Sequence, residues 1–270
     1  MSLFDRFRRN KALKKRSLNE HAPKHCFVIC KSVESGDPTQ AADAVAKVFG
    51  KGYSVDHSDP NIFVVQRGNE TVGFLAHMPA PIPGGEAEGN ADGNFLWPEG
   101  EKEVSQHQSH VIVTTMGAED KSPIEAAIVL TKLALVALQV FDGLGVYWGN
   151  ANVCNSRAVF ESFSEGMSSE HVPVPIWLRF QFVGVSDTEI GMYTLGMQQF
   201  GLMEIEVDRC KLTLEDLFEF VSNIAHYLIQ SGPVIADGNT VGGDEKEQIL
   251  VRHLPSMIED TKTVYKILFD

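Results

Sequence analysis

The same local pattern occurs twice in this chain, about 85 residues apart, and it restricts the fold more than any other feature of the sequence. A β-prone run, 25–30 or 110–115, begins 13 residues before a proline, Pro38 or Pro123. Each proline stands at the first position of a predicted helix, between an N-cap residue and a Gln or Glu that can reach back to the cap. A glycine and another β-prone run follow each helix. The pattern predicts two β-α-β units, related by duplication or alike by chance.

The rest of the sequence continues with strands and helices in mixed order. Further strands are predicted over 62–66, 71–78, 176–185, 188–197, 202–207, 249–253 and 264–269, and further helices over 156–166 and 213–230. The Pro- and Gly-rich stretch 79–94 is expected to be a mobile acidic loop. The helix after Pro123 is apolar nearly all round, which is typical of a central core helix. Its 16-residue apolar run contains Lys132 and is too short and too polar to cross a bilayer. We therefore predict an α+β fold, with mixed or antiparallel sheets, helices mainly on one face, and repeated β-α-β units.

This order of elements divides the chain into three predicted parts. A basic N-terminal tail spans residues 1–20. An α+β region over 21–186 holds the two β-α-β units, at about 25–95 and 109–186. A C-terminal α+β domain covers 187–270.

The charge of the chain is unevenly distributed. Residues 1–16 contain seven Lys or Arg and one acid, giving +6, whereas the whole chain carries −13, which leaves −19 for the remainder. An acidic body of this size disfavours nucleic acid, because phosphates would be repelled, and it favours a basic protein partner or simply solubility. Leu3, Phe4 and Phe7 alternate with basic residues, so residues 1–16 could contact an anionic membrane surface, dock on an acidic partner, or stay a solvated tail.

The sequence lacks the motifs that usually carry catalysis or cofactor binding. Its four cysteines do not form a disulfide framework, and none stands in the Cys-x-x-Cys pair of a zinc site. The glycine pairs at 84–85 and 242–243 match neither a phosphate-binding loop nor a dinucleotide-binding motif. No serine lies in a nucleophile elbow. We therefore predict no catalytic residue, no metal and no cofactor and, because no secretory signal is recognisable, a cytoplasmic location without a transmembrane segment.

The most site-like stretch connects a predicted strand to a predicted helix, a position where α/β folds often bind ligands. The candidate ligand- or partner-binding residues in it are Trp148, Asn150, Asn152, Asn155 and Arg157. An amide cluster with a guanidinium group suits binding of a carboxylate or a peptide backbone. The alternative is a capped connection with Trp148 in the core.

Three histidines and two acids provide weaker candidates. His77, His107 and His110 stand at the ends of predicted strands, so they would converge if those strands pair. Three imidazoles would form an open zinc site that activates water, and isolated surface histidines are the alternative. Glu204 and Glu206 share one face of a predicted strand, where we expect a solvated edge.

The C-terminal part of the chain resembles an uncharacterised bacterial family. The resemblance lies in a Thr-Leu-Gly-Met, Phe-Gly, Glu-Ile-Glu-Val pattern at 194–197, 200–201 and 204–207, followed by a helix and an Asp-Gly turn at 237–238. It covers about residues 187–268, and the region from 109 to 148 is similar to its usual companion region. The family is named only as a domain of unknown function. The resemblance implies a bacterial cytosolic protein and provides no catalytic residues.

These features favour a non-enzymatic cytosolic protein-binding module, an immunity or adaptor protein for a basic partner. Compact acidic α+β proteins without active sites resemble, by analogy, immunity proteins that neutralise toxic enzymes. The alternative is a small-molecule or metal-dependent enzyme with its site near Trp148–Arg157 and the three histidines. The sequence leaves the oligomeric state open.

Overall fold

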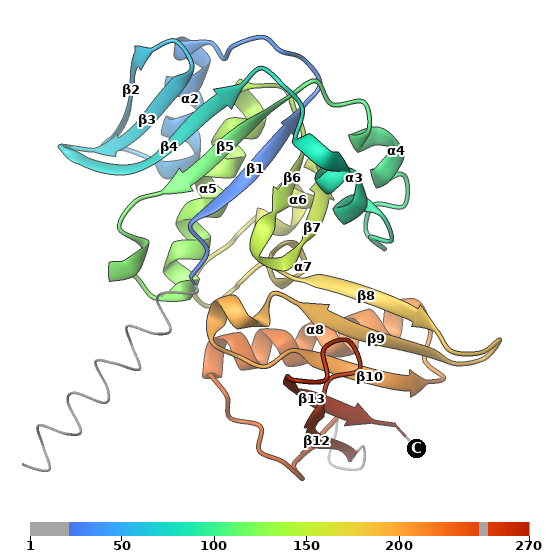
Figure 1. Cartoon of the computed structure of the whole chain (residues 1–270). Helices are drawn as coiled ribbons and strands as arrows, with labels where there is room; N and C mark the ends of the chain where they lie inside the picture. Colours follow the sequence, from blue (N-terminus) through green and yellow to red (C-terminus); the bar gives the residue numbers. More distant parts are fainter. Residues whose placement is uncertain (1–21, 243–247, 270) are drawn as a thin grey trace, which may run out of the picture.

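The computed structural model describes residues 22–242 and 248–269, which form two sheets with helices packed against them (Figure 1). The predicted α+β fold class is confirmed. The basic tail 1–20 and the amphipathic segment 1–16 lie outside the described residues.

The N-terminal sheet has seven strands in the order β2-β3-β4-β5-β1-β6-β7. These are β1 (His25–Cys30), β2 (Tyr53–Asp59), β3 (Ile62–Arg67), β4 (Glu70–Met78), β5 (Ser109–Thr115), β6 (Gly143–Trp148) and β7 (Val153–Ser156). Every neighbouring pair is antiparallel, so β1 runs parallel to β2, and β5 runs parallel to β6. Both predicted β-α-β units therefore exist. They share one sheet, because β1 pairs with both β5 and β6.

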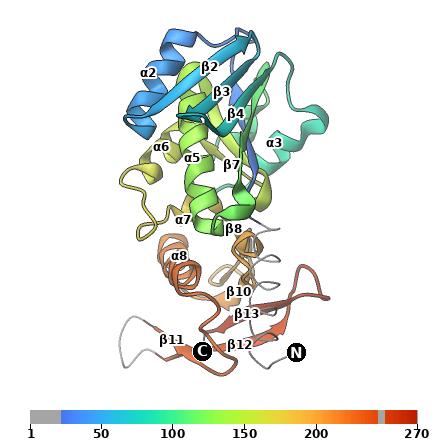
Figure 2. The ribbon, with the colours of Figure 1, turned by 90° about the vertical axis from the view of Figure 1, so that its left-hand side faces the viewer.

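The longer helices cover one face of this sheet and the shorter ones cover the other (Figure 2). The first group is α2 (Pro38–Phe49), α5 (Pro123–Val140) and α6 (Arg157–Ser164), and the second is α3 (Glu86–Ala91) and α4 (Gly100–Val104). Asp37 caps α2, and Ser122 forms a reciprocal capping box with Glu125 at the start of α5. The prediction of a mobile loop over 79–94 is wrong. This segment contains η1 (Pro83–Gly85) and α3, and α3 buries Ala87 and Ala91.

The C-terminal sheet has six strands in the order β11-β12-β13-β10-β9-β8. They are β8 (Arg179–Gly184), β9 (Ile190–Leu195), β10 (Ile205–Cys210), β11 (Thr240–Val241), β12 (Ile249–Pro255) and β13 (Thr263–Leu268). The pairing is antiparallel except between β10 and β13. Helix α8 (Leu214–Ser231), which is capped by Thr213 as predicted, lies against one face of the sheet (Figure 1). The predicted domain boundary near 187 falls between β8 and β9, which pair with each other.

Helix α5 is the centre of the main hydrophobic core. The prediction that this segment is too short and too polar to cross a membrane is not met, because the 18-residue helix is long and apolar enough by length and composition. Ten of its residues are buried, as in the core helix of a folded domain. The helix ends without a glycine stop, since Asp142 adopts the left-handed conformation, with φ of 47°. By contrast, α2 stops at Gly50 as predicted. The short elements η2 (Ala118–Asp120), η3 (Gly149–Ala151), α7 (Val174–Trp177) and η4 (Met197–Phe200) complete the described fold.

Candidate functional site

Trp148, the first of the predicted site residues, belongs to the core. Its side chain is 1% exposed and stacks on Trp177, with 6.3 Å between ring centroids. Its Nε1 donates a hydrogen bond of 2.9 Å to Oε1 of Gln199, which lies in η4 of the C-terminal part. Trp148 therefore joins the two sheets through a buried hydrogen bond.

The other four predicted residues do not gather around Trp148. Asn150 and Asn152 are exposed on the turn between β6 and β7, whereas Asn155 is buried and accepts a hydrogen bond of 3.2 Å from Nδ2 of Asn94. Arg157 starts α6 and pairs with Glu161 at 2.9 Å. The hairpin sends these side chains in different directions, because neighbouring strand residues face opposite sides of a sheet. These five residues therefore do not share one pocket, and ligand binding by this stretch stays a prediction.

The three histidines neither converge on one point nor lie isolated on the surface, since all three are buried. His77 pairs in register with Val111, so the neighbouring His110 points to the opposite face of the sheet. Nε2 of His107 accepts a hydrogen bond from the Ile82 N–H and its Nδ1 lies 2.7 Å from the Val104 carbonyl, so both ring nitrogens are used. Burial lowers the pKa of His77 and of His110. No group of three metal-ligating side chains occurs among the described residues.

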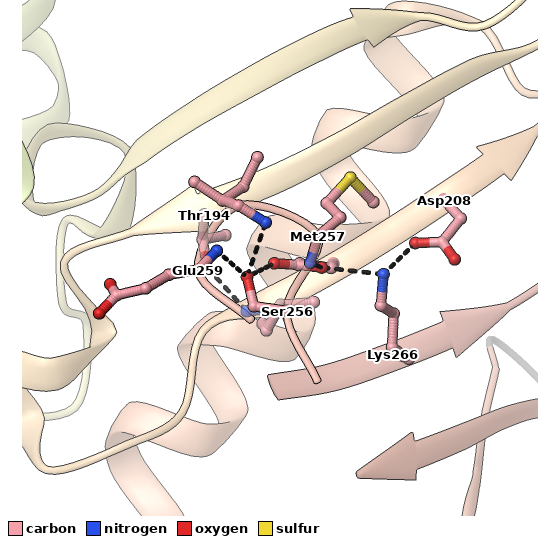
Figure 3. A network of polar contacts seen from close by, with 9 residues as sticks. Thr194, Asp208, Ser256, Met257, Glu259 and Lys266 are labelled. Atoms are coloured by element: carbon pink, nitrogen blue, oxygen red, sulfur yellow. Dashed lines mark hydrogen bonds and ion pairs between the residues drawn. The ribbon is translucent and has the colours of Figure 1, made fainter. Parts of the chain in front are cut away.

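The C-terminal sheet holds a buried polar network on the face opposite α8 (Figure 3). Glu206 on β10 and Lys266 on β13 are directly paired in register, and their side chains are 2% and 7% exposed. Nζ of Lys266 lies 2.9 Å from Oε2 of Glu206 and also contacts the carboxylate of Asp208. Desolvation opposes the charge of Lys266, but the hydrogen bonds and charges of these two acids outweigh it and raise the pKa of Lys266. The predicted solvated edge at Glu206 is therefore wrong.

Ser256 links this network to the loop that follows β12. Its hydroxyl donates to Glu206 and accepts hydrogen bonds from the backbone N–H groups of Ile258 and Glu259, at 3.0 and 3.2 Å (Figure 3). The backbone N–H of Met257 donates to the same carboxylate at 3.0 Å. These bonds fix the backbone of residues 256–259 above the sheet. Because the Ser256 oxygen already accepts two N–H groups and its proton is directed at Glu206, its arrangement is that of a loop anchor.

The anchored loop presents two apolar side chains to solvent. Met257 is 45% exposed and Ile258 is 53% exposed, while Glu259 and Asp260 follow them on the surface. We name residues 256–262 together with the sheet face opposite α8 the open face. Leu250 and Val183, at the two sides of that face, are also exposed large hydrophobic residues. Apolar side chains rimmed by polar groups are typical of protein-binding surfaces.

Three cations of the open face are neutralised by carboxylates, whereas Arg179 on β8 donates to Gln181 and to backbone carbonyls. Lys266 pairs with Glu206 and Asp208, whereas Arg252 pairs with Asp237 and Lys262 pairs with Glu259. Asp260 is exposed next to these pairs. The acids therefore outnumber the bases on the open face, which gives it a negative character.

A second buried carboxylate lies beside this network. Glu204 is 8% exposed and accepts hydrogen bonds from the Thr194 hydroxyl at 2.8 Å and from the Gly196 N–H at 2.9 Å. Burial raises its pKa to about 7, although these hydrogen bonds act in the opposite direction. Gly196 and Gly201, the glycines of the Thr-Leu-Gly-Met and Phe-Gly patterns, both have positive φ. Gln199 lies between these glycines and donates to the carbonyls of Gly196 and Trp177. Since the Gly196 N–H donates to Glu204, Gln199 connects this carboxylate to the contact between the sheets.

Comparison with known proteins places this network in a recognised domain. Residues 193–268 match a family model, Domain of unknown function (DUF4261). The DUF4261 region spans β9 to β13 with α8, and it includes Glu204, Glu206, Ser256 and Lys266. This match supports the predicted relation to an uncharacterised family. Neither the curated proteins nor the solved structures contain a significant match to the chain.

The sequence itself contains one signal for this network. Lys266 is the single charged residue in the run Val264–Leu268, which is otherwise apolar. A lysine on a buried strand requires a carboxylate partner, because an unpaired buried charge is strongly unfavourable. Glu206 is such a partner, but only the parallel pairing of β10 with β13 identifies it.

Proposed function

We propose that this chain is a non-enzymatic, bacterial, cytosolic protein-binding module, an immunity or adaptor protein whose partner is basic. The observation that carries the proposal is the exposed pair Met257 and Ile258, held by a buried ionic network on an acidic sheet face. A fixed loop loses little conformational entropy when it binds, so its apolar side chains can contribute affinity efficiently. The surrounding acids would steer a basic partner toward the loop.

The overall charge supports the same kind of partner. Helices α3 and α4 and their connection expose further acids, namely Glu86, Asp92, Glu99, Glu101 and Glu103, against Lys102. Long-range attraction from such a surface accelerates encounter with a positively charged protein and weakens at high salt. The four cysteines are buried and free, which suits the reducing cytosol.

Capture experiments with matched variants test this proposal. An N-terminally tagged chain is compared with M257S/I258S and with M78S/M116S, which changes two exposed methionines of the N-terminal sheet. We expect the wild-type protein and the M78S/M116S control to capture one basic protein from native lysate at low salt, and M257S/I258S to lose it. Titration of the purified partner by calorimetry should then show binding about tenfold weaker or worse for M257S/I258S.

Two outcomes would contradict the proposal. One is an acidic partner whose binding does not weaken between low and high salt. The other is an equal loss of binding in M257S/I258S and in the M78S/M116S control, which would exclude the open face as the binding surface.

A further inference from the structure

A second surface, on the N-terminal sheet, gathers several basic side chains. Two adjoining hollows, of about 560 and 980 Å³, lie along α5 and share Lys132 and Met167. The first is bounded by the end of α2 and by β2, β3 and β4, and the second by α2 and α6. We name the two together the α5 groove.

Two cations of the groove are held by aromatic rings. The Arg67 guanidinium lies 5.7 Å from the centroid of the Tyr53 ring, and Nζ of Lys132 lies 5.7 Å from that of Phe49. The two rings are 4.9 Å apart, so the four side chains form one continuous row. A ring positions a cation without neutralising it, so the charge remains available to an anion.

These cations form no ion pair among the described residues, although Glu70 stands opposite Arg67 in the pairing of β3 with β4. Among the described residues, no carboxylate forms an ion pair with Arg67, Lys132 or the exposed Lys47, which also lines the groove. By contrast, Arg157 at the far end pairs with Glu161. Five basic side chains line the groove, Lys47, Arg67, Lys121, Lys132 and Arg157, against the four acids Glu70, Glu125, Glu161 and Glu165. Bases therefore outnumber acids there, in a protein whose residues 17–270 carry −19.

The floor and the length of the groove indicate the kind of ligand. The outward side of α5 offers Ile128, Val129 and Leu135, which are all half-buried. The lining residues on α5 extend from Glu125 to Gln139, which corresponds to about 21 Å along the helix. A groove of this length exceeds the usual size of a small-molecule site and suits a peptide segment with apolar side chains on one side.

We infer that the α5 groove binds an acidic peptide segment of a partner protein, with apolar side chains on α5 and carboxylates toward Lys47, Arg67 and Lys132. This inference does not rest on the proposed function, since it concerns another sheet and a partner of opposite charge. Together the two surfaces would give the chain the two binding faces of an adaptor.

A displayed library of 12-residue peptides, rich in Glu, Asp, Lys, Leu and Phe, tests the inference on the full chain. We expect selected peptides to combine acidic with apolar residues. The tightest one, labelled with fluorescein, is then titrated by fluorescence polarisation into the wild type, K47E/R67E and K31E/K102E. Both double variants change the net charge equally, but Lys31 and Lys102 are exposed outside the groove.

The expected result is binding about tenfold weaker or worse in K47E/R67E at 50 mM salt, with K31E/K102E close to wild type and all three melting at similar temperatures. A third variant, K132M, removes the central charge and keeps an apolar stem, and it should also weaken binding. Selection of basic peptides, absence of saturable binding, or equal binding to K47E/R67E and wild type would each overturn the inference. The open face is unchanged in these variants. A negative result for the α5 groove would therefore not affect the capture test of the open face with M257S/I258S.

Discussion

Replacing Lys266 by methionine tests the buried network of the open face directly. The substitution removes the ammonium group that lies 2.9 Å from Glu206 and leaves an apolar side chain of similar length. Glu206 would keep its hydrogen bonds from Ser256 and from the Met257 N–H, but it would lose its buried counter-charge. Asp208 is half-exposed and can be solvated by water instead.

The expected loss of unfolding free energy follows from the burial of the Lys266–Glu206 pair. At 2.9 Å and an effective dielectric constant near 20, the gross attraction between the two charges is about 6 kcal/mol. Part of this offsets the desolvation of Lys266, which the variant no longer undergoes, so we expect a loss of about 3–5 kcal/mol in the free energy of unfolding. The double variant E206Q/K266M has no buried charge, so its loss should be smaller, about 1–2 kcal/mol.

Urea denaturation followed by tryptophan fluorescence at pH 7.5 measures these differences, since Trp148 and Trp177 are buried between the sheets. The decisive comparison is the single variant against the double variant. If E206Q/K266M were as unstable as K266M, or if K266M lost less than about 1 kcal/mol, Glu206 would not be a buried anion that depends on Lys266, and the anchoring of residues 256–259 would need another explanation.

Three further predictions concern other contacts. The pKa of Glu204 is raised from 4.5 to about 7 in the folded state, so the native protein holds a proton that the unfolded chain releases. The contribution of Glu204 to stability should therefore be complete below about pH 4.5 and decrease by about 3 kcal/mol toward pH 7. A difference between wild type and E204Q that stays constant over this range in denaturation curves would contradict the assignment. The variant Q199L leaves the Nε1–H of Trp148 buried without an acceptor and should lose about 2–4 kcal/mol in urea denaturation, which an unchanged midpoint would refute. The variant S122A breaks the capping box of α5 and should lose about 1 kcal/mol by the same measurement, whereas a loss near zero would show that the box contributes nothing.

The helices were largely predictable because their signals are local. Asp37 and Ser122 each precede a proline and accept hydrogen bonds from backbone N–H groups within three residues, so the sequence contains both partners of each cap. The same holds for Thr213 at α8. The exception is the end of α5, where Asp142 rather than a glycine adopts the left-handed conformation. Asp tolerates this conformation better than most residues, so composition alone favoured the wrong position.

The candidate site was less predictable because its partners are distant in sequence. Ser256 contacts Glu206 across 50 positions, and Trp148 contacts Gln199 across 51. The composition of the Asn-rich turn is typical of binding loops, so it predicts a binding site there. In the structure the hairpin distributes these residues between core and solvent. Glu204 and Glu206 were expected at a solvated edge because acids on strands usually are, and only the pairing of β10 with β9 and β13 places them inside the sheet.

The sequence by itself determined the elements of this protein, because alternation of apolar residues, helix caps and turns depends on side chains within a few positions of one another. It also determined the negative charge, which is a sum over residues and needs no structure. The tertiary structure alone decided that the two β-α-β units share one sheet, that Lys266 meets Glu206, and that Arg67 and Lys132 lie in one groove. These contacts depend on which strands become neighbours, and that choice follows from burying the apolar faces of the whole chain at once.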